Sequence, residues 1–133
     1  MSKTVLYQSV GEELFRWDVD VAAATLTRRD SVALPSKVQY VWPHPSREFL
    51  TVSTSDAPSG NTSDKGKVHR MCALRVGANG ELALHGAGAP LPSRPIHHCV
   101  DRSGNFALTA FNNPSHITVH RINSDGTIGA LVE

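Results

Sequence analysis

Three side chains that could transfer protons or bind a metal stand together in the sequence His97-His98-Cys99. Imidazole exchanges a proton near neutral pH and, like thiolate, binds zinc. The surrounding residues predict a β-strand, in which His97 and Cys99 lie on one face and His98 lies on the other. The three side chains cannot converge on one ion, and no second ligand pair stands at zinc-site spacing, so we predict no bound metal. His97 then has two interpretations: a contact to a small molecule, or a structural histidine bonded to a neighbouring sheet.

The carboxylates of Asp18 and Asp20 form a second pair that could act as an acid and a base. Both follow an apolar strand pattern and precede a turn, where aspartate commonly accepts hydrogen bonds from backbone amides. We interpret them as turn residues. The chain has no G-x-S-x-G nucleophile motif, no Walker loop and no dinucleotide-binding glycine motif. We therefore predict neither a serine-hydrolase site nor a cofactor.

Charge and cysteine content narrow the class of protein further. Thirteen Lys and Arg residues against 12 Asp and Glu give a net charge of +1, which indicates no surface for nucleic acid or for an anionic membrane. No apolar run is long enough to span a membrane. The first residues lack the apolar core of a signal peptide, and we expect Cys72 and Cys99 to be free thiols. These features predict a cytoplasmic protein.

These side chains must be positioned by strands, because a two-residue periodicity runs through the 133 residues. Apolar, β-branched and aromatic residues alternate with polar ones, and turn sequences rich in Gly, Asn, Asp and Pro separate the segments. No segment has the apolar spacing of a long helix, so we predict an all-β protein. The predicted strands are 4–9, 14–19, 25–33, 38–43, 48–54, 68–76, 81–86, 95–100, 105–111, 116–122 and 127–132.

Parts of the chain are repeated. RVGANGELAL at 75–84 aligns with RINSDGTIGAL at 121–131, and PSREFLTVS at 45–53 aligns with RSGNFALTA at 102–110. A four-stranded unit that recurs about every 40 to 50 residues is typical of β-propeller blades. We predict about three antiparallel blades, the first of which has three strands and lacks its innermost one. The predicted blades are 4–34, 38–87 and 95–132.

Blades are stabilised by stacking on their neighbours around a ring, so three blades leave two faces and one strand edge open. We expect the remaining blades to come from another chain or from a C-terminal fragment. A six-bladed ring of two copies of this chain is the alternative. The stretch 55–67 is polar and lacks periodicity, and we expect it to be a long exposed loop.

Two strand–turn–strand patterns carry a resemblance to a known family. They are V-Q-x-x-x-x-x-P-S-x-x-F-L-x-V from Val38 to Val52 and P-I-H-x-x-x-D-x-S-G-x-F from Pro95 to Phe106. Both are similar to blade repeats of the 6-phosphogluconolactonase family. The resemblance implies a seven-bladed β-propeller and hydrolysis of a sugar lactone such as 6-phosphogluconolactone, or the related lactonisation of muconate derivatives.

The resemblance also implies where a ligand binds. A small-molecule lactone or organic acid would occupy the mouth of the central channel, which the innermost strands 38–43 and 95–100 line. His97 matches a channel-facing polar position of the family, and Gln39 is its counterpart one blade earlier, so both are expected to contact the substrate. The family's catalytic residues correspond to positions after Glu133. The alternative function is a non-enzymatic propeller that serves as a binding platform, because the fold hosts many functions.

Overall fold

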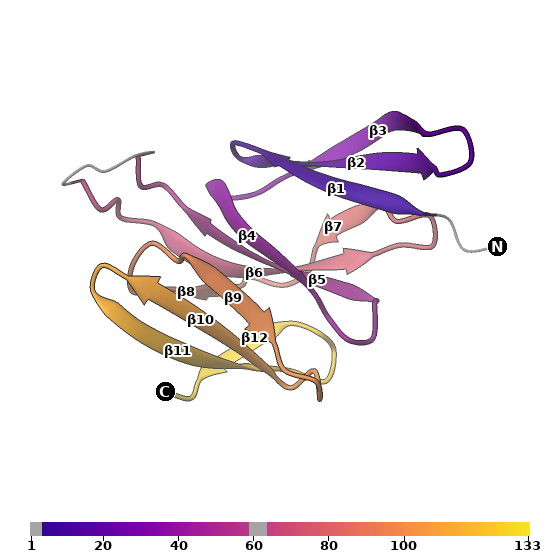
Figure 1. Cartoon of the computed structure of the whole chain (residues 1–133). Helices are drawn as coiled ribbons and strands as arrows, with labels where there is room; N and C mark the ends of the chain where they lie inside the picture. Colours follow the sequence, from indigo (N-terminus) through magenta and orange to yellow (C-terminus); the bar gives the residue numbers. More distant parts are fainter. Residues whose placement is uncertain (1–3, 59–63) are drawn as a thin grey trace.

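The computed structural model describes residues 4–58 and 64–133, and within them it contains strands and no helix. The strands form three antiparallel sheets that stack one on another (Figure 1). No described segment is a helix of the length and apolarity that a membrane crossing requires. The prediction of an all-β protein is confirmed.

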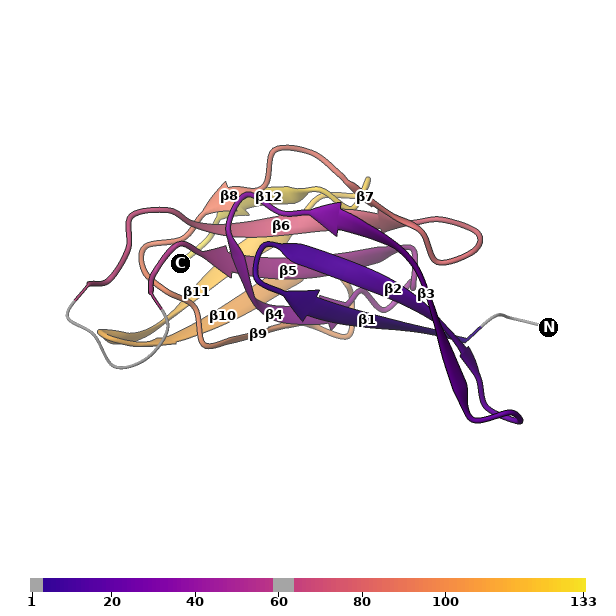
Figure 2. The same ribbon diagram turned by 90° about the horizontal axis from the view of Figure 1, so that it is seen from above.

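The first sheet has the order β1-β2-β3. Its strands are β1 (Val5–Val10), β2 (Glu13–Asp20) and β3 (Thr25–Ala33). The β2–β3 hairpin extends beyond the rest of the molecule in Figure 2, and every residue of β3 except Val32 is exposed. Paired charges line this hairpin, with Arg16 bound to Asp30 and Arg29 bound to Asp18.

The second sheet has the order β4-β5-β6-β7, and β8 pairs with the start of β6. Its strands are β4 (Lys37–Pro43), β5 (Phe49–Ser55), β6 (His69–Val76), β7 (Leu82–Leu84) and β8 (Ala89–Pro90). All seven residues of β5 are buried, because this strand lies inside the sheet and both of its faces are covered by neighbouring sheets.

The third sheet has the order β12-β11-β10-β9. Its strands are β9 (His97–Val100), β10 (Phe106–Asn112), β11 (Ser115–Ile122) and β12 (Ile128–Leu131). Figure 2 shows β1, β4 and β9 along one side of the three sheets, with β7, β8 and β12 on the opposite side. β4 packs against both β1 and β9. We call the side formed by β1, β4 and β9 the inner edge.

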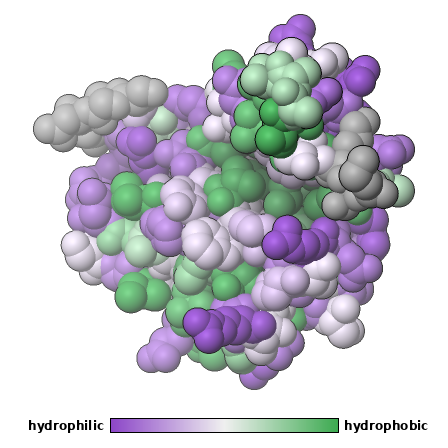
Figure 3. Space-filling view, turned by 45° about the vertical axis from the view of Figure 1, so that its right-hand side comes forward, coloured by the Kyte–Doolittle hydropathy of each residue, from purple (hydrophilic) through white to green (hydrophobic). Residues whose placement is uncertain are grey.

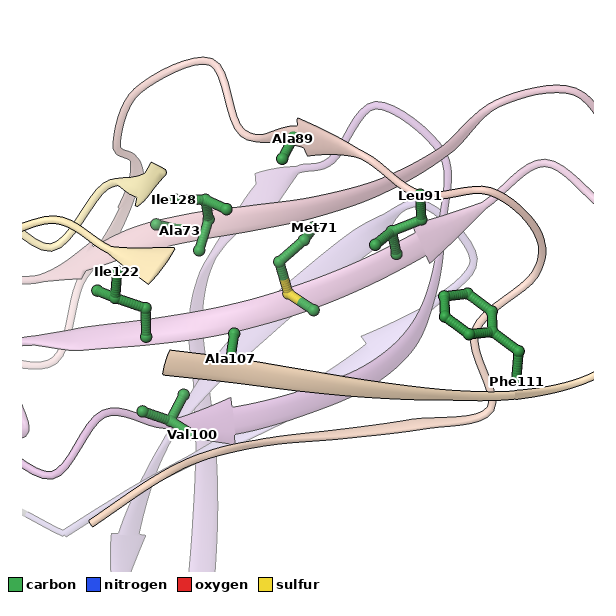
Figure 4. Packing of buried hydrophobic residues seen from close by; sticks show 9 residues of the cluster. All are labelled: Met71, Ala73, Ala89, Leu91, Val100, Ala107, Phe111, Ile122 and Ile128. Carbon is green, nitrogen blue, oxygen red and sulfur yellow. The ribbon is translucent and has the colours of Figure 1, made fainter. Parts of the chain in front are cut away.

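Two apolar clusters fill the spaces between the sheets. Leu14, Leu34, Leu50, Val52, Cys72 and Leu74 lie between the first and second sheets. Met71, Ala73, Ala89, Leu91, Val100, Ala107, Phe111, Ile122 and Ile128 lie between the second and third (Figure 4). On the face shown in Figure 3, apolar side chains form separate areas among polar ones. The core of this molecule is therefore a set of intersheet layers.

Turn glycines contribute to the stacking of the second and third sheets. Gly126, between β11 and β12, has a φ of +87°, and a Cβ atom at this position would overlap the ring of Phe49 on β5. Gly104, between β9 and β10, has a φ of +77° and packs in the same way against the ring of His44. Both positions combine a left-handed backbone with a close approach between sheets, and only glycine satisfies both conditions.

Most of the predicted strands agree with the structure within one or two residues, but two expectations are wrong in part. The segment expected as one strand over 81–86 forms only β7, because left-handed glycines at 86 and 88 end it, and β8 follows unpredicted. In the stretch expected as an exposed loop, Ser55 belongs to β5 and is buried, as is Ala57. Residues 59–63 of that stretch lie outside the described part of the chain.

Candidate functional site

The strand starts of β4 and β9 lie side by side on the inner edge, and the polar residues expected to contact a ligand gather there. The contacts that join these segments include a hydrogen bond between Gln39 and Arg94 and a ring contact between Tyr40 and His97. Each contact connects the second sheet with the segment that enters the third. We call the set Gln39, Tyr40, Arg94 and His97 the inner-edge cluster.

Gln39 occupies a β-bulge. Val38 pairs with Thr54 and Tyr40 pairs with Ser53, so Gln39 is an extra residue with no partner on β5. A bulge twists its strand and redirects the side chain of the inserted residue. Here the Gln39 amide donates a hydrogen bond to the carbonyl of Lys37 (3.1 Å), which fixes the amide orientation. Its Oε1 is thereby presented to the third sheet.

Arg94 precedes β9, and its Nε donates a hydrogen bond to Gln39 Oε1 at 2.9 Å. The guanidinium is only partly buried. No other hydrogen bond or ion pair connects its side chain to the residues that the structure describes. Its two terminal nitrogens therefore remain available to a ligand, because guanidinium carries five N–H donors and Gln39 uses one.

His97 is the exposed member of the cluster. Its ring lies 4.3 Å from the ring of Tyr40, at an interplanar angle of 49°, and 5.8 Å from the ring of Trp42. The two aromatic side chains hold the imidazole by packing, and none of the described residues hydrogen bonds to its ring nitrogens. Both nitrogens can therefore reach a bound molecule or solvent.

His98 points the opposite way and is fully buried between the second and third sheets. Thr51 Oγ1 donates to the carbonyl of Trp42 (3.0 Å), so it accepts a hydrogen bond from His98 Nε2 (2.9 Å). Nδ1 then carries no proton and accepts from Ser53 Oγ (3.1 Å). This network assigns one neutral tautomer to His98, with the proton on Nε2.

Burial of the ring lowers the pKa of His98 to about 4, an effect that outweighs the opposing hydrogen bond from Nε2 to the backbone carbonyl of Thr51 (3.2 Å). The imidazole is therefore neutral at pH 7 and links the sheets as an uncharged hydrogen-bonding group. The alternation predicted for the His-His-Cys sequence is present, since His97 is exposed and His98 is buried. The structural histidine bonded to a neighbouring sheet is thus His98, while the substrate-contact role expected of His97 and Gln39 remains a prediction.

The other residues considered for chemistry have structural roles. Asp20 Oδ1 accepts a hydrogen bond from the backbone amide of Ala23 (2.9 Å), as expected for a turn residue. The same interpretation is wrong for Asp18, which lies within β2 opposite Thr27 and forms an ion pair with Arg29. Among residues 4–58 and 64–133, no three His, Cys, Asp or Glu side chains lie close enough to share a metal ion.

Sequence reasoning missed two residues of this cluster, Tyr40 and Arg94, and Arg94 is the charged one. Its partner Gln39 lies 55 positions earlier, so no local pattern connects the two. One signal was present: Arg94 directly precedes Pro95 at the entrance to a predicted inner strand. Proline favours an extended conformation in the residue before it, which directs the arginine along the strand start.

The sequence of this chain matches a known protein family and several relatives. The model of a family described as "Lactonase, 7-bladed beta-propeller" matches residues 4–133. Relatives include the 6-phosphogluconolactonase of Cronobacter sakazakii, which is 28% identical over 99% of this chain and 36% of the relative. The protein of the same name from Xenorhabdus nematophila is 26% identical over 98% of this chain and 37% of the relative.

The solved structures agree on the fold. The periplasmic gluconolactonase of Pseudomonas aeruginosa superimposes with a TM-score of 0.78 at 19% sequence identity, over 98% of this chain and 38% of that protein. The chain thus spans somewhat more than a third of the length of the relatives that it matches.

Proposed function

Because this chain belongs to the family of seven-bladed β-propeller lactonases, we propose that it forms part of an enzyme that hydrolyses a sugar lactone. The observation that carries the proposal is the inner-edge cluster, in which an arginine and an exposed histidine at the start of β9 contact the adjacent inner strand β4. The innermost strands of a propeller surround its central channel, and ligands bind at the channel mouth in this proposal.

Lactone hydrolysis needs few groups, because the ester carbonyl is already electrophilic. A base removes a proton from water as the water oxygen bonds to the carbonyl carbon, and hydrogen-bond donors stabilise the resulting oxyanion. The ring C–O bond then breaks, and the leaving oxygen takes a proton to give the hydroxy acid. An imidazole with free nitrogens suits the base or the proton donor.

His97 is the described residue of the inner edge that best fits proton transfer. It is exposed, and its ring packs against the rings of Tyr40 and Trp42. The segments 36–42 and 93–100, which contain most of β4, all of β9 and the residues just before each strand, include no Asp or Glu. We therefore propose that His97 acts together with groups from other blades, or binds a substrate hydroxyl. Lactonisation of a muconate-type acid uses the same parts in reverse and is the closest alternative reaction.

The ring itself is part of the proposal. The first sheet has three described strands, and the family is seven-bladed. We propose that the remaining blades and the missing innermost strand come from another chain or from a C-terminal fragment. A cytoplasmic location is supported by Cys72 and Cys99, which are free thiols as in proteins of reducing compartments.

The test is hydrolysis of glucono-1,5-lactone and 6-phosphogluconolactone by the complete propeller that contains this chain, followed by pH-stat titration and corrected for spontaneous opening. His97→Gln should lower turnover by about 10- to 10³-fold, because glutamine retains hydrogen bonding but does not transfer protons. His116→Gln is the matched control, since His116 lies near the start of β11, outside the inner-edge cluster, and stacks on Phe111, and it should leave turnover unchanged.

A change below twofold in His97→Gln, with the fold intact, would contradict proton transfer by His97. We expect no turnover from this chain by itself. A complete propeller inert toward lactones and muconates would contradict the enzymatic function and favour the binding platform.

A further inference from the structure

We propose that Arg94 is a specificity-determining residue that binds an oxyanion group, phosphate or carboxylate, carried by the lactone substrate. The proposal rests on the proposed lactonase function and assigns the substrate class. The side chain of Arg94 forms its one hydrogen bond to the described residues with a neutral partner, the amide of Gln39.

The first step of the argument is orientation. The bulge at Gln39 and the hydrogen bond from its amide to Lys37 fix the Oε1 that receives Arg94 Nε at 2.9 Å. Holding a guanidinium by Nε leaves the two terminal nitrogens pointing away from the contact as a planar fork. That fork matches the oxygens of phosphate or carboxylate, which bind it through two parallel hydrogen bonds.

The second step is charge. Arg16 and Arg29 are each paired with an aspartate, Asp30 and Asp18, and their charges are compensated within the first sheet. Arg94 has no carboxylate partner among the described residues, since Gln39 is neutral. The segments 36–42 and 93–100 contain Lys37 and Arg94 but no acidic residue. The starts of the two inner strands therefore carry uncompensated positive charge, which favours an anion.

The third step is reach. Arg94 stands three residues before His97, and an extended chain separates such Cα atoms by at most about 10 Å. Pro95 lies between them and favours an extended conformation at Arg94. Both side chains also contact consecutive residues of β4, Arg94 at Gln39 and His97 at Tyr40. In this proposal one ligand of the size of a substituted sugar touches both, with its anionic group at Arg94 and its reacting ring toward His97.

The experiment compares anionic with neutral lactones on the complete propeller. The ratio of kcat/KM for 6-phosphogluconolactone to kcat/KM for glucono-1,5-lactone should fall about 10- to 100-fold in Arg94→Gln, the range expected for charge-assisted hydrogen bonds. The same ratio with muconolactone tests a carboxylate. A loss confined to the phosphorylated lactone identifies phosphate as the ligand group, and a loss confined to muconolactone identifies carboxylate.

Two further variants sharpen the test. Gln39→Glu keeps the length of the side chain and the acceptor for Arg94 Nε, gives up the hydrogen bond to the Lys37 carbonyl and neutralises the charge of the guanidinium, so it should lower the same ratio by a similar factor. Arg102→Gln is the matched control, because Arg102 is an exposed arginine in the turn at the far end of β9. It should leave both substrates unaffected. An equal loss on anionic and neutral lactones in Arg94→Gln would overturn the proposal.

A binding measurement distinguishes failure of the anion site at Arg94 from failure of the proposed lactonase function. Calorimetric titration with 6-phosphogluconate and with muconate requires no turnover. A loss of affinity of 10-fold or more in Arg94→Gln, in a propeller that hydrolyses no lactone, would support the anion site and reject the lactonase. The 10-fold threshold corresponds to one charge-assisted hydrogen bond at about 1.4 kcal/mol. Affinities for both anions within twofold of wild type would overturn the anion site even in an active lactonase.

Discussion

His97 and His98 are neighbours in the chain, yet their surroundings give them different chemistry. His97 contacts aromatic rings and solvent, whereas His98 is fully buried and bonded to Thr51 and Ser53 of the second sheet. Protonation of His98 would place a charge between two sheets and would put a proton where Ser53 donates. Of the two histidines, His98 forms the hydrogen bonds between sheets and is therefore the less suited to exchange protons at neutral pH.

His98 should make stability depend on pH. Its pKa is about 4 in the folded protein and about 6.5 when unfolded, so the unfolded chain binds more protons between these values. The stability it contributes is fully present above pH 6.5 and is lost as the pH falls toward 4. The shift corresponds to about 3 kcal/mol. Urea unfolding of the complete propeller at pH 7 and pH 4 measures this loss.

The matched variants are His98→Gln and His97→Gln. Glutamine at 98 can donate to Thr51 and accept from Ser53 without titrating, so the loss of stability between pH 7 and pH 4 should shrink by about that amount. The same substitution at His97, whose charge is the smallest of the contributions to the pKa of His98, should shrink the loss much less. Equal pH dependence in wild type and His98→Gln would contradict the assignment.

At the scale of elements, strand β5 contacts the first sheet with one face and the third sheet with the other. Its alternate residues Leu50 and Val52 join the apolar cluster next to the first sheet, while Thr51 and Ser53 face the third sheet and bind His98. A strand with both faces covered buries polar as well as apolar side chains, and the polar ones need partners. The histidine on β9 supplies them.

The turn between β11 and β12 provides an element-scale prediction. Gly126→Ala should lower the free energy of unfolding by about 2 to 5 kcal/mol, because it adds left-handed strain to a clash with the buried ring of Phe49. Gly11→Ala is the control: Gly11 also has a positive φ, +58°, but no other atom lies within 4 Å of the position that a Cβ would take there. It should cost only the strain, about 1 to 2 kcal/mol.

Chemical denaturation of both variants separates the two contributions, and the difference between them measures the packing of the turn against the second sheet. Equal losses in Gly126→Ala and Gly11→Ala would show that this turn does not press on Phe49.

At the scale of the whole molecule, the described residues leave apolar side chains and a strand edge uncovered. Ile117 on the outer face of the third sheet is 65% exposed, and Leu131 on β12 is 60% exposed. On the inner edge, β1 pairs with β2 but with no other described strand. Such faces and edges are covered by neighbouring blades in a closed ring.

We therefore expect this chain to occur in an assembly heavier than its own 14.3 kDa. Native mass spectrometry of the purified protein should find it bound to the polypeptide that supplies the other blades. A stable, folded monomer of 14.3 kDa that does not aggregate would contradict this expectation, and a dimer with a closed six-bladed ring would favour self-assembly.

All strands except β8, most of their bounds and the opposite faces of His97 and His98 could be predicted from the amino-acid sequence. Alternation and turn glycines are local properties, so they can be recognised within a few residues. The spacing of the repeats predicted the propeller fold, because units of similar sequence stack on one another in similar ways.

Which histidine is held between sheets, and which arginine joins the inner edge, became known from the tertiary structure. Gln39 and Arg94 meet across 55 positions, and their contact depends on a bulge that shifts the register of β4 against β5. Ser55 and Ala57 are buried for a similar reason, since the chain around them packs within the sheet. Contacts between stacked sheets depend on register and stacking together, and neither is a property of a single segment.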